Sequence, residues 1–132
     1  MKDLSDIYPS KRHIRKRIVV MPAFNAVSTL ETTYKDIPKS AVDDIILVDD
    51  HSSDGTPELA ERLGIKVIRH HKNKGYGANQ KTCYDAALAQ GADVIIMIHP
   101  DYQYDPRLIP YFLGFIEMNI CDVMIGSRIR TR

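Results

Sequence analysis

The sequence lacks the features that would place it in several large classes of protein. Its net charge of +1 gives no overall field that would attract nucleic acid. Its two cysteines, Cys83 and Cys121, have neither metal-site spacing nor a disulfide framework, so we expect both to be reduced core residues. No apolar run approaches the roughly 20 residues that cross a bilayer, and no signal-peptide pattern opens the chain. We therefore expect a cytoplasmic protein that binds no nucleic acid, with peripheral attachment to the inner face of a membrane left open.

What is present is an ordinary globular composition. The 132 residues are 44% hydrophobic and 27% charged, which fits one domain with a buried core. A basic stretch at residues 10–17 precedes the first apolar segment. It could touch anionic lipid headgroups, but a solvated lead-in is the favoured interpretation. We therefore divide the chain into a basic lead-in, residues 1–17, and one domain, residues 18–132.

Apolar segments recur along the domain at a spacing of roughly 25 residues, as in βα units. Five of them are predicted strands: residues 18–21, 45–48, 66–69, 94–98 and 123–125. Helix signals lie between them. The alternation predicts a three-layer α/β/α fold with a mostly parallel, Rossmann-like sheet.

The helix signals are capping residues and glycines. Ser28 and Glu31 are predicted to form a capping box at the start of the first helix. Thr56 is the predicted N-cap of the second helix. A third helix is predicted at residues 78–90, and a fourth begins near Asp105.

Polar residues follow each of the first four predicted strands. These clusters begin at Pro22, Asp49, His70 and His99. Right-handed crossovers bring all four to one edge of the sheet. Ligands of open α/β sheets bind in the crevice beyond that edge, so the four clusters together predict a binding site.

The second cluster contains two adjacent aspartates. Asp49 and Asp50 are placed to accept hydrogen bonds from a base or a ribose. The alternative is an Asx-turn in which Asp50 and Ser52 satisfy local amides. Both interpretations can hold at once.

The third cluster combines histidines, glycines and an asparagine. Gly75 and Gly77 let the backbone approach a ligand and begin a helix whose N-terminus favours anions. The alternative for Asn79 is that it only caps or packs. His70 and His71 are predicted to be structural or solvent-facing, because adjacent residues in a strand point to opposite faces.

The fourth cluster carries groups that suit a hard cation with a phosphate ligand: His99, Asp101, Gln103 and Asp105. The alternative is that Asp101 and Asp105 only cap the following helix.

Taken in order, residues 20–25, 48–56, 73–79 and 101–103 resemble family 2 glycosyltransferases, most closely the polyprenyl- or dolichyl-phosphate sugar synthases. The resemblance covers residues 18–128 and implies the nucleotide-binding half of a glycosyltransferase A fold. It implies an enzyme that binds a UDP- or GDP-linked sugar through Mg²⁺ or Mn²⁺, with a polyprenyl phosphate at a membrane face as the candidate acceptor. The implied nucleotide contacts are Pro22, Phe24, Asn25, Asp49, Asp50, Gly75, Gly77, Asn79 and Asp101. The implied metal ligands are Asp101, Gln103 and His99.

The chain departs from the family pattern in three ways. His99 stands where the D-x-D motif has its first aspartate, which should lower the affinity for a hard cation. Ala26 replaces a glutamate that commonly follows the asparagine. The acceptor-binding part and the catalytic base of such enzymes follow the position of residues 126–128, so no catalytic base is assigned here.

The sequence also allows functions other than transfer. One alternative is a non-catalytic module that binds a nucleotide-sugar, or a truncated and inactive fragment. A response-regulator receiver is disfavoured, because its acidic pair would follow the first strand rather than the second. A domain cut short would also expose apolar surface or a sheet edge, which favours a homo-oligomer.

Overall fold

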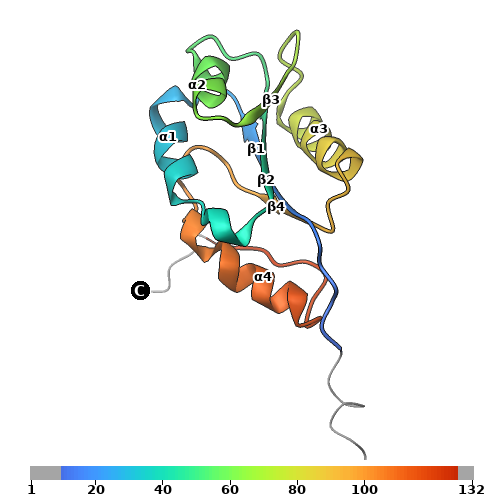
Figure 1. Ribbon diagram of the computed structural model, residues 1–132. Helices are drawn as coiled ribbons and strands as arrows, with labels where there is room; N and C mark the ends of the chain where they lie inside the picture. Colours follow the sequence, from blue (N-terminus) through green and yellow to red (C-terminus); the bar gives the residue numbers. More distant parts are fainter. Residues whose placement is uncertain (1–9, 128–132) are drawn as a thin grey trace, which may run out of the picture.

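The computed structural model describes residues 10–127. Predictions that fall on residues 1–9 and 128–132 lie outside the described residues. The four strands are parallel and lie in the order β3-β2-β1-β4 (Figure 1). Their bounds are β1 Arg17–Ala23, β2 Asp44–Asp49, β3 Lys66–Arg69 and β4 Val94–Met97. Because the strands are parallel, the carboxyl ends of all four lie at one edge of the sheet.

Helices cover both faces of the sheet (Figure 1). The helices are α1 Val27–Asp36, α2 Thr56–Arg62, α3 Tyr76–Ala89 and α4 Ile109–Glu117, with short 3₁₀ helices η2 Lys39–Ala41 and η3 Pro106–Leu108. Helix α3 packs Cys83 against Ile18 and Val20 on one face. Helices α1, α2 and α4 pack on the other face, where β1 contributes Val19 and Met21. The predicted three-layer architecture and the burial of Cys83 are therefore confirmed.

The predicted fifth strand is wrong. Residues 123–125 have no regular structure, and Val123 and Ile125 are 72% and 83% exposed. The apolar run predicted a strand, but no described strand pairs with it, so it has no ladder to join. Cys121 is half-buried and leads into this irregular segment. The segment, α4 and the open edge of β4 line a cavity of about 660 Å³.

The described part of the basic lead-in is held against the domain. The Arg12 guanidinium donates to the Asn119 side chain at 2.7 Å, and that of Arg17 pairs with Glu117 at 2.7 Å. The amides of Arg15 and Lys16 donate to the carboxylate of Asp93. Residues 10–17 are thus anchored rather than simply solvated. No helix within residues 10–127 is both long enough and apolar enough to span a membrane.

Candidate functional site

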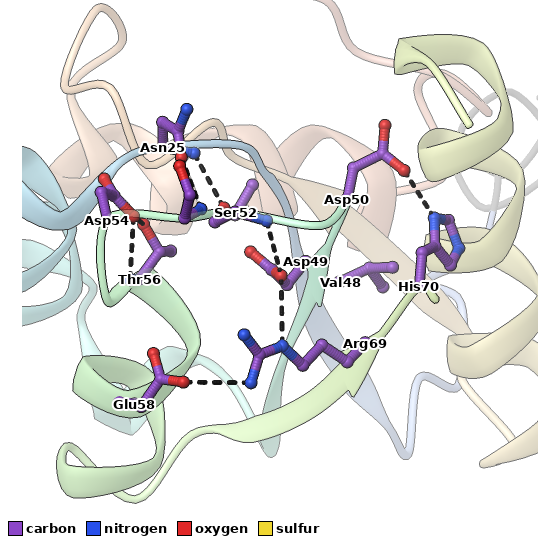
Figure 2. A network of polar contacts seen from close by, with 12 residues as sticks. Asn25, Val48, Asp49, Asp50, Ser52, Asp54, Thr56, Glu58, Arg69 and His70 are labelled. Atoms are coloured by element: carbon purple, nitrogen blue, oxygen red, sulfur yellow. Dashed lines mark hydrogen bonds and ion pairs between the residues drawn. The ribbon is translucent and has the colours of Figure 1, made fainter. Parts of the chain in front are cut away.

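The loops after β1 and β2 are fastened to each other by side chains (Figure 2). The amide of Asn25 donates to the Ser52 hydroxyl at 2.8 Å, and the Asn25 side-chain oxygen accepts from the amide of Ser53 at 3.0 Å. Asn25 and His51 both have positive φ angles, 49° and 69°, which these bonds hold in place. These two bonds therefore tie the loops after β1 and β2 to each other at the carboxyl end of the sheet.

The same loop caps helix α1, which corrects the predicted capping box. The amide of Ala26 donates to the Thr56 hydroxyl at 2.8 Å, and that of Val27 donates to the Asp54 carboxylate at 3.0 Å. No local side chain caps α1, and Glu31 pairs with Lys35 instead. The helix begins at Val27 with Ala26 as its N-cap, so Ser28 is already the second helical residue and cannot take the N-cap position of a capping box.

Helix α2 also begins differently from the prediction. Gly55, with a φ of 87°, precedes it as the N-cap, and Thr56 is its first residue. The Thr56 hydroxyl is turned toward Ala26 and Asp54, so Thr56 caps the neighbouring helix rather than its own.

Asp49 ends β2 with its carboxylate fully buried. Its Oδ2 atom accepts from the Ser52 amide at 3.0 Å and lies 3.7 Å from the guanidinium of Arg69 (Figure 2). Its Oδ1 atom is buried and has no hydrogen-bond partner among the described residues. An orphaned buried acceptor costs about 1–3 kcal/mol, so this oxygen is suited to a donor from a bound molecule.

Asp50 is used differently, as a clamp within the protein. Its Oδ1 atom accepts from the ring of His70 at 2.7 Å and from the amide of Lys74 at 2.9 Å, and its Oδ2 atom accepts from the amide of Gly75 at 2.9 Å. Burial alone would raise the pKa of Asp50, but these bonds outweigh burial and hold its pKa below the ordinary value. Asp50 thus fixes the turn that begins α3.

The histidine pair takes the predicted structural and solvent-facing roles. His70 is buried, and its second ring nitrogen lies 2.9 Å from the Thr82 hydroxyl of α3. His71 is exposed. His70 therefore links Asp50 to the helix that follows the turn.

Gly75 and Asn79 shape the start of α3, which begins two residues before the predicted position. Gly75 has a φ of 86°, and a Cβ atom added there or at Gly77 would meet no atom within 4 Å. The side-chain nitrogen of Asn79 donates to the Val48 carbonyl at 3.0 Å, and its buried oxygen has no partner among the described residues. The backbone at the two glycines therefore faces open space, which would let a bound molecule approach it closely.

Pro22 and Phe24 lie at the end of β1. Pro22 is buried in the strand and has no amide hydrogen, and the ladder to β4 ends just before it, at Val20. Phe24, two residues further along, is 54% exposed and offers an apolar surface.

The fourth cluster is divided between three tasks. The amide of Gln103 donates to the exposed carboxylate of Asp101 at 3.0 Å. His99 lies 2.7 Å from the hydroxyl of Tyr76. Asp105 is the N-cap of η3 and forms a bidentate pair with Arg107, whose hydrogen bond lowers the pKa of Asp105. Asp105 therefore takes the capping role, and both of its carboxylate oxygens are engaged by Arg107.

The side chains at this edge can hold a cation only if a bound molecule supplies further oxygen ligands. Among residues 10–127, no three histidine, cysteine or acidic side chains gather as a metal site. Asp101 supplies one exposed carboxylate, whereas hard cations take six or more oxygens. The residues present therefore suit a cation that shares the oxygens of a bound diphosphate.

Two parts of the site were missed from the sequence. Asp54 and Thr56 serve the helix before them, and Tyr76 contacts His99 across 23 positions. One feature of the sequence pointed to a role for Tyr76. Tyr76 and Gln80 are four residues apart, which places both on one face of α3.

Comparison with known proteins adds to this geometry. The sequence profile of glycosyl transferase family 2 matches residues 18–132. A protein of Methanocaldococcus jannaschii, named only as uncharacterized, is 34% identical over 110 residues, which cover 83% of this chain and 45% of that protein. A dolichol-phosphate mannosyltransferase of Pyrococcus furiosus is 32% identical over 117 residues, which cover 83% of this chain and 32% of that protein. The chain thus spans less than half the length of these two relatives.

A solved structure shares the fold. Glucosyl-3-phosphoglycerate synthase from Mycobacterium tuberculosis, crystallised with Mn²⁺, UDP and glucosyl-3-phosphoglycerate, matches with a TM-score of 0.66 at 24% identity. The match covers 78% of this chain and 40% of the synthase.

Proposed function

This chain belongs to glycosyl transferase family 2, and we propose on that premise that its crevice binds a nucleotide-diphosphate sugar together with a divalent cation. The fold is the predicted glycosyltransferase A fold. The solved neighbour that shares it contains UDP and Mn²⁺, which supports the proposal. The single observation on this chain that carries the proposal is the orphaned Oδ1 atom of Asp49.

Asp49 offers an acceptor to the base or the ribose. Uracil and guanine each present a ring N–H, and a ribose presents hydroxyls, so any of them satisfies the buried oxygen. Phe24 supplies an exposed apolar surface in the loop after β1, and the neighbouring Asn25 is held there by Ser52 and Ser53. Both a UDP-linked and a GDP-linked sugar fit this chemistry.

The diphosphate is proposed to lie between α3 and Asp101. The first turn of α3 directs backbone amides out of the helix, and its dipole favours negative charge. Gly75 and Gly77 leave room for a phosphate to approach these amides. Asp101, with Gln103 beside it, is proposed to hold Mg²⁺ or Mn²⁺ against the phosphate oxygens. When bound, such a cation supplies positive charge to the leaving diphosphate.

The acceptor is proposed from the names of relatives. The Pyrococcus furiosus relative is a dolichol-phosphate mannosyltransferase, and another, from Micrococcus luteus, is an undecaprenyl-phosphate mannosyltransferase. We therefore propose a polyprenyl phosphate at a membrane surface as the acceptor. A second candidate is binding of the nucleotide-sugar without transfer.

Calorimetric titration with UDP and with GDP, each in the presence of MnCl₂, tests the site. In Asp49→Asn, Oδ2 must still accept from Ser52, so the new amide group faces the ligand N–H at the Oδ1 position. We expect binding to weaken by roughly 10- to 100-fold, the effect of one buried donor left unpaired. The matched control is Asp85→Asn, an exposed aspartate on α3. Equal affinity in the two variants would contradict the role of Asp49.

Transfer separates the two candidate functions. Purified chain is incubated with a radiolabelled UDP- or GDP-sugar and a polyprenyl phosphate, and the lipid fraction is counted. Labelled lipid supports the transferase, and nucleotide binding without labelled lipid supports the binding module.

A further inference from the structure

Three side chains at the seam between α3 and β4 form a hydrogen-bonded chain that ends at His99. The side-chain nitrogen of Gln80 lies 2.7 Å from the hydroxyl oxygen of Tyr76, and that oxygen lies 2.7 Å from Nε2 of His99. The same Gln80 nitrogen lies 3.3 Å from the sulfur of Met97 on β4. The rings of Tyr76 and His99 are stacked, with centroids 5.4 Å apart.

The contacts define the direction of the bond between Gln80 and Tyr76. A thioether sulfur has lone pairs and no proton, so the amide of Gln80 turns its NH₂ group, not its oxygen, toward Met97 and Tyr76. The hydroxyl oxygen of Tyr76 therefore accepts from Gln80. Its single proton is then free to be donated to Nε2 of His99. Burial raises the pKa of Tyr76, which keeps that proton in place at neutral pH.

Donation from Tyr76 would give His99 a fixed tautomer. Nε2 would then be an acceptor, and the proton of the neutral ring would be on Nδ1. In this arrangement neither ring nitrogen has a lone pair to offer a cation. His99 instead presents one N–H donor directly after β4, two residues from Asp101.

We propose that Tyr76 and Gln80 hold His99 as a hydrogen-bond donor to a phosphate oxygen of the nucleotide, and not as a metal ligand. This rests on the proposed function. Asp101 is then the single carboxylate that this cluster offers to the cation, and part of the affinity for the diphosphate comes from His99 without the cation. The D-x-D motif has an aspartate at the position of His99. In this chain the side chain at that position contacts a phosphate oxygen and not the metal.

A purely packing role for the Tyr76–His99 stack makes a different prediction. Packing is indifferent to which ring nitrogen carries the proton, and it is kept in Tyr76→Phe, which removes only the hydroxyl. The tautomer and the cation-independent affinity are therefore the readouts that separate the two roles.

The test combines nuclear magnetic resonance with calorimetry on the full chain. Long-range ¹H–¹⁵N spectra, with His99 assigned by His99→Gln, report which ring nitrogen is protonated. We expect the Nδ1–H tautomer in the parent chain and a mixture in Tyr76→Phe. UDP and GDP are then titrated with EDTA and with MnCl₂, using Tyr84→Phe on the same helix as the matched control.

The expected binding results follow from one lost charge-assisted bond. His99→Gln and Tyr76→Phe should weaken nucleotide binding in EDTA by roughly tenfold, and Tyr84→Phe should leave it unchanged. His99→Asp should weaken it further in EDTA, because a carboxylate repels phosphate, while lowering the MnCl₂ concentration needed for half-maximal binding.

Two results would overturn the proposal while leaving the proposed function intact. One is an Nε2–H tautomer in the parent chain, and the other is equal nucleotide affinity in the parent, His99→Gln and Tyr76→Phe. Failure of the parent chain to bind either nucleotide under both conditions would instead overturn the proposed function itself.

Discussion

Replacing Asp50 by asparagine removes the acceptor that holds the turn before α3. The two carboxylate oxygens of Asp50 face three donors: the ring of His70 and the amides of Lys74 and Gly75. An asparagine has one oxygen and one NH₂ group, so in either orientation a donor faces a donor. The better orientation keeps the two bonds at the Oδ1 position and sets the NH₂ group against Gly75.

The size of the effect follows from these bonds. The amide of Gly75 also donates to the Asn73 side-chain oxygen at 3.0 Å and keeps that bond, so the donor left without an acceptor is the new NH₂ group. A buried donor without an acceptor costs about 1–3 kcal/mol, and the two remaining bonds weaken because they lose a charged partner. The side chain of Asp50 is 4% exposed, so solvent offers little compensation. We expect Asp50→Asn to lower the free energy of unfolding by about 2–4 kcal/mol in total.

Urea unfolding followed by circular dichroism at pH 7 measures this loss. The exposed Asp85→Asn is the control, with an expected change within about 0.5 kcal/mol. The amides of Lys74 and Gly75 should also exchange with solvent faster in Asp50→Asn. Equal unfolding free energies in the two variants would refute the clamp.

The pH dependence gives a second check. Because the folded state lowers the pKa of Asp50, its stabilisation is present above the unfolded pKa of about 3.9 and is lost as the pH falls through the folded pKa. The difference between the parent and Asp50→Asn should therefore be constant from pH 5 to 7 and shrink below pH 4. A difference that grew on acidification would contradict the account.

Three further predictions concern other parts of the chain. Asp54→Asn should lower the free energy of unfolding by about 1 kcal/mol in urea, because its carboxylate caps α1, whereas Glu31→Gln should not; equal losses would contradict the cap. Burial raises the pKa of Cys83 to about 12, so a thiol reagent should label Cys121 at once and Cys83 only on unfolding; rapid double labelling would contradict this. The chain should self-associate through exposed apolar surface, and Ile125→Lys should weaken that association in sedimentation velocity; an unchanged profile would exclude this surface.

The sequence was sufficient for elements that depend on local pattern. Four apolar runs became the four strands, because β-branched and apolar residues favour a strand whether it is buried on both faces, as β1 and β2 are, or half-buried, as β4 is. The run at residues 123–125 has the same composition but no described partner strand, and composition alone cannot supply one. The start of α3 was placed two residues late, because the clamp from Asp50 on Gly75 spans 25 positions.

The sequence predicted the location of the candidate site better than the contacts within it. The strand-end clusters were predicted to meet, and the loops after β1 and β2 do so through Asn25 and Ser52. The sequence could not assign different roles to Asp49 and Asp50. Both oxygens of Asp50 are paired because His70 and Gly75 lie beside it, whereas Oδ1 of Asp49 has no partner among the described residues. Such differences arise from tertiary contacts.

Cation-dependent nucleotide binding at Asp101 tests the central claim most directly. UDP and GDP are titrated by calorimetry into the parent chain and into Asp101→Ala, with MnCl₂ and with EDTA. The account predicts that MnCl₂ tightens binding of one nucleotide to the parent and has no effect on Asp101→Ala. Binding that MnCl₂ strengthens equally in both proteins would contradict the assignment of this edge of the sheet as the diphosphate and cation site.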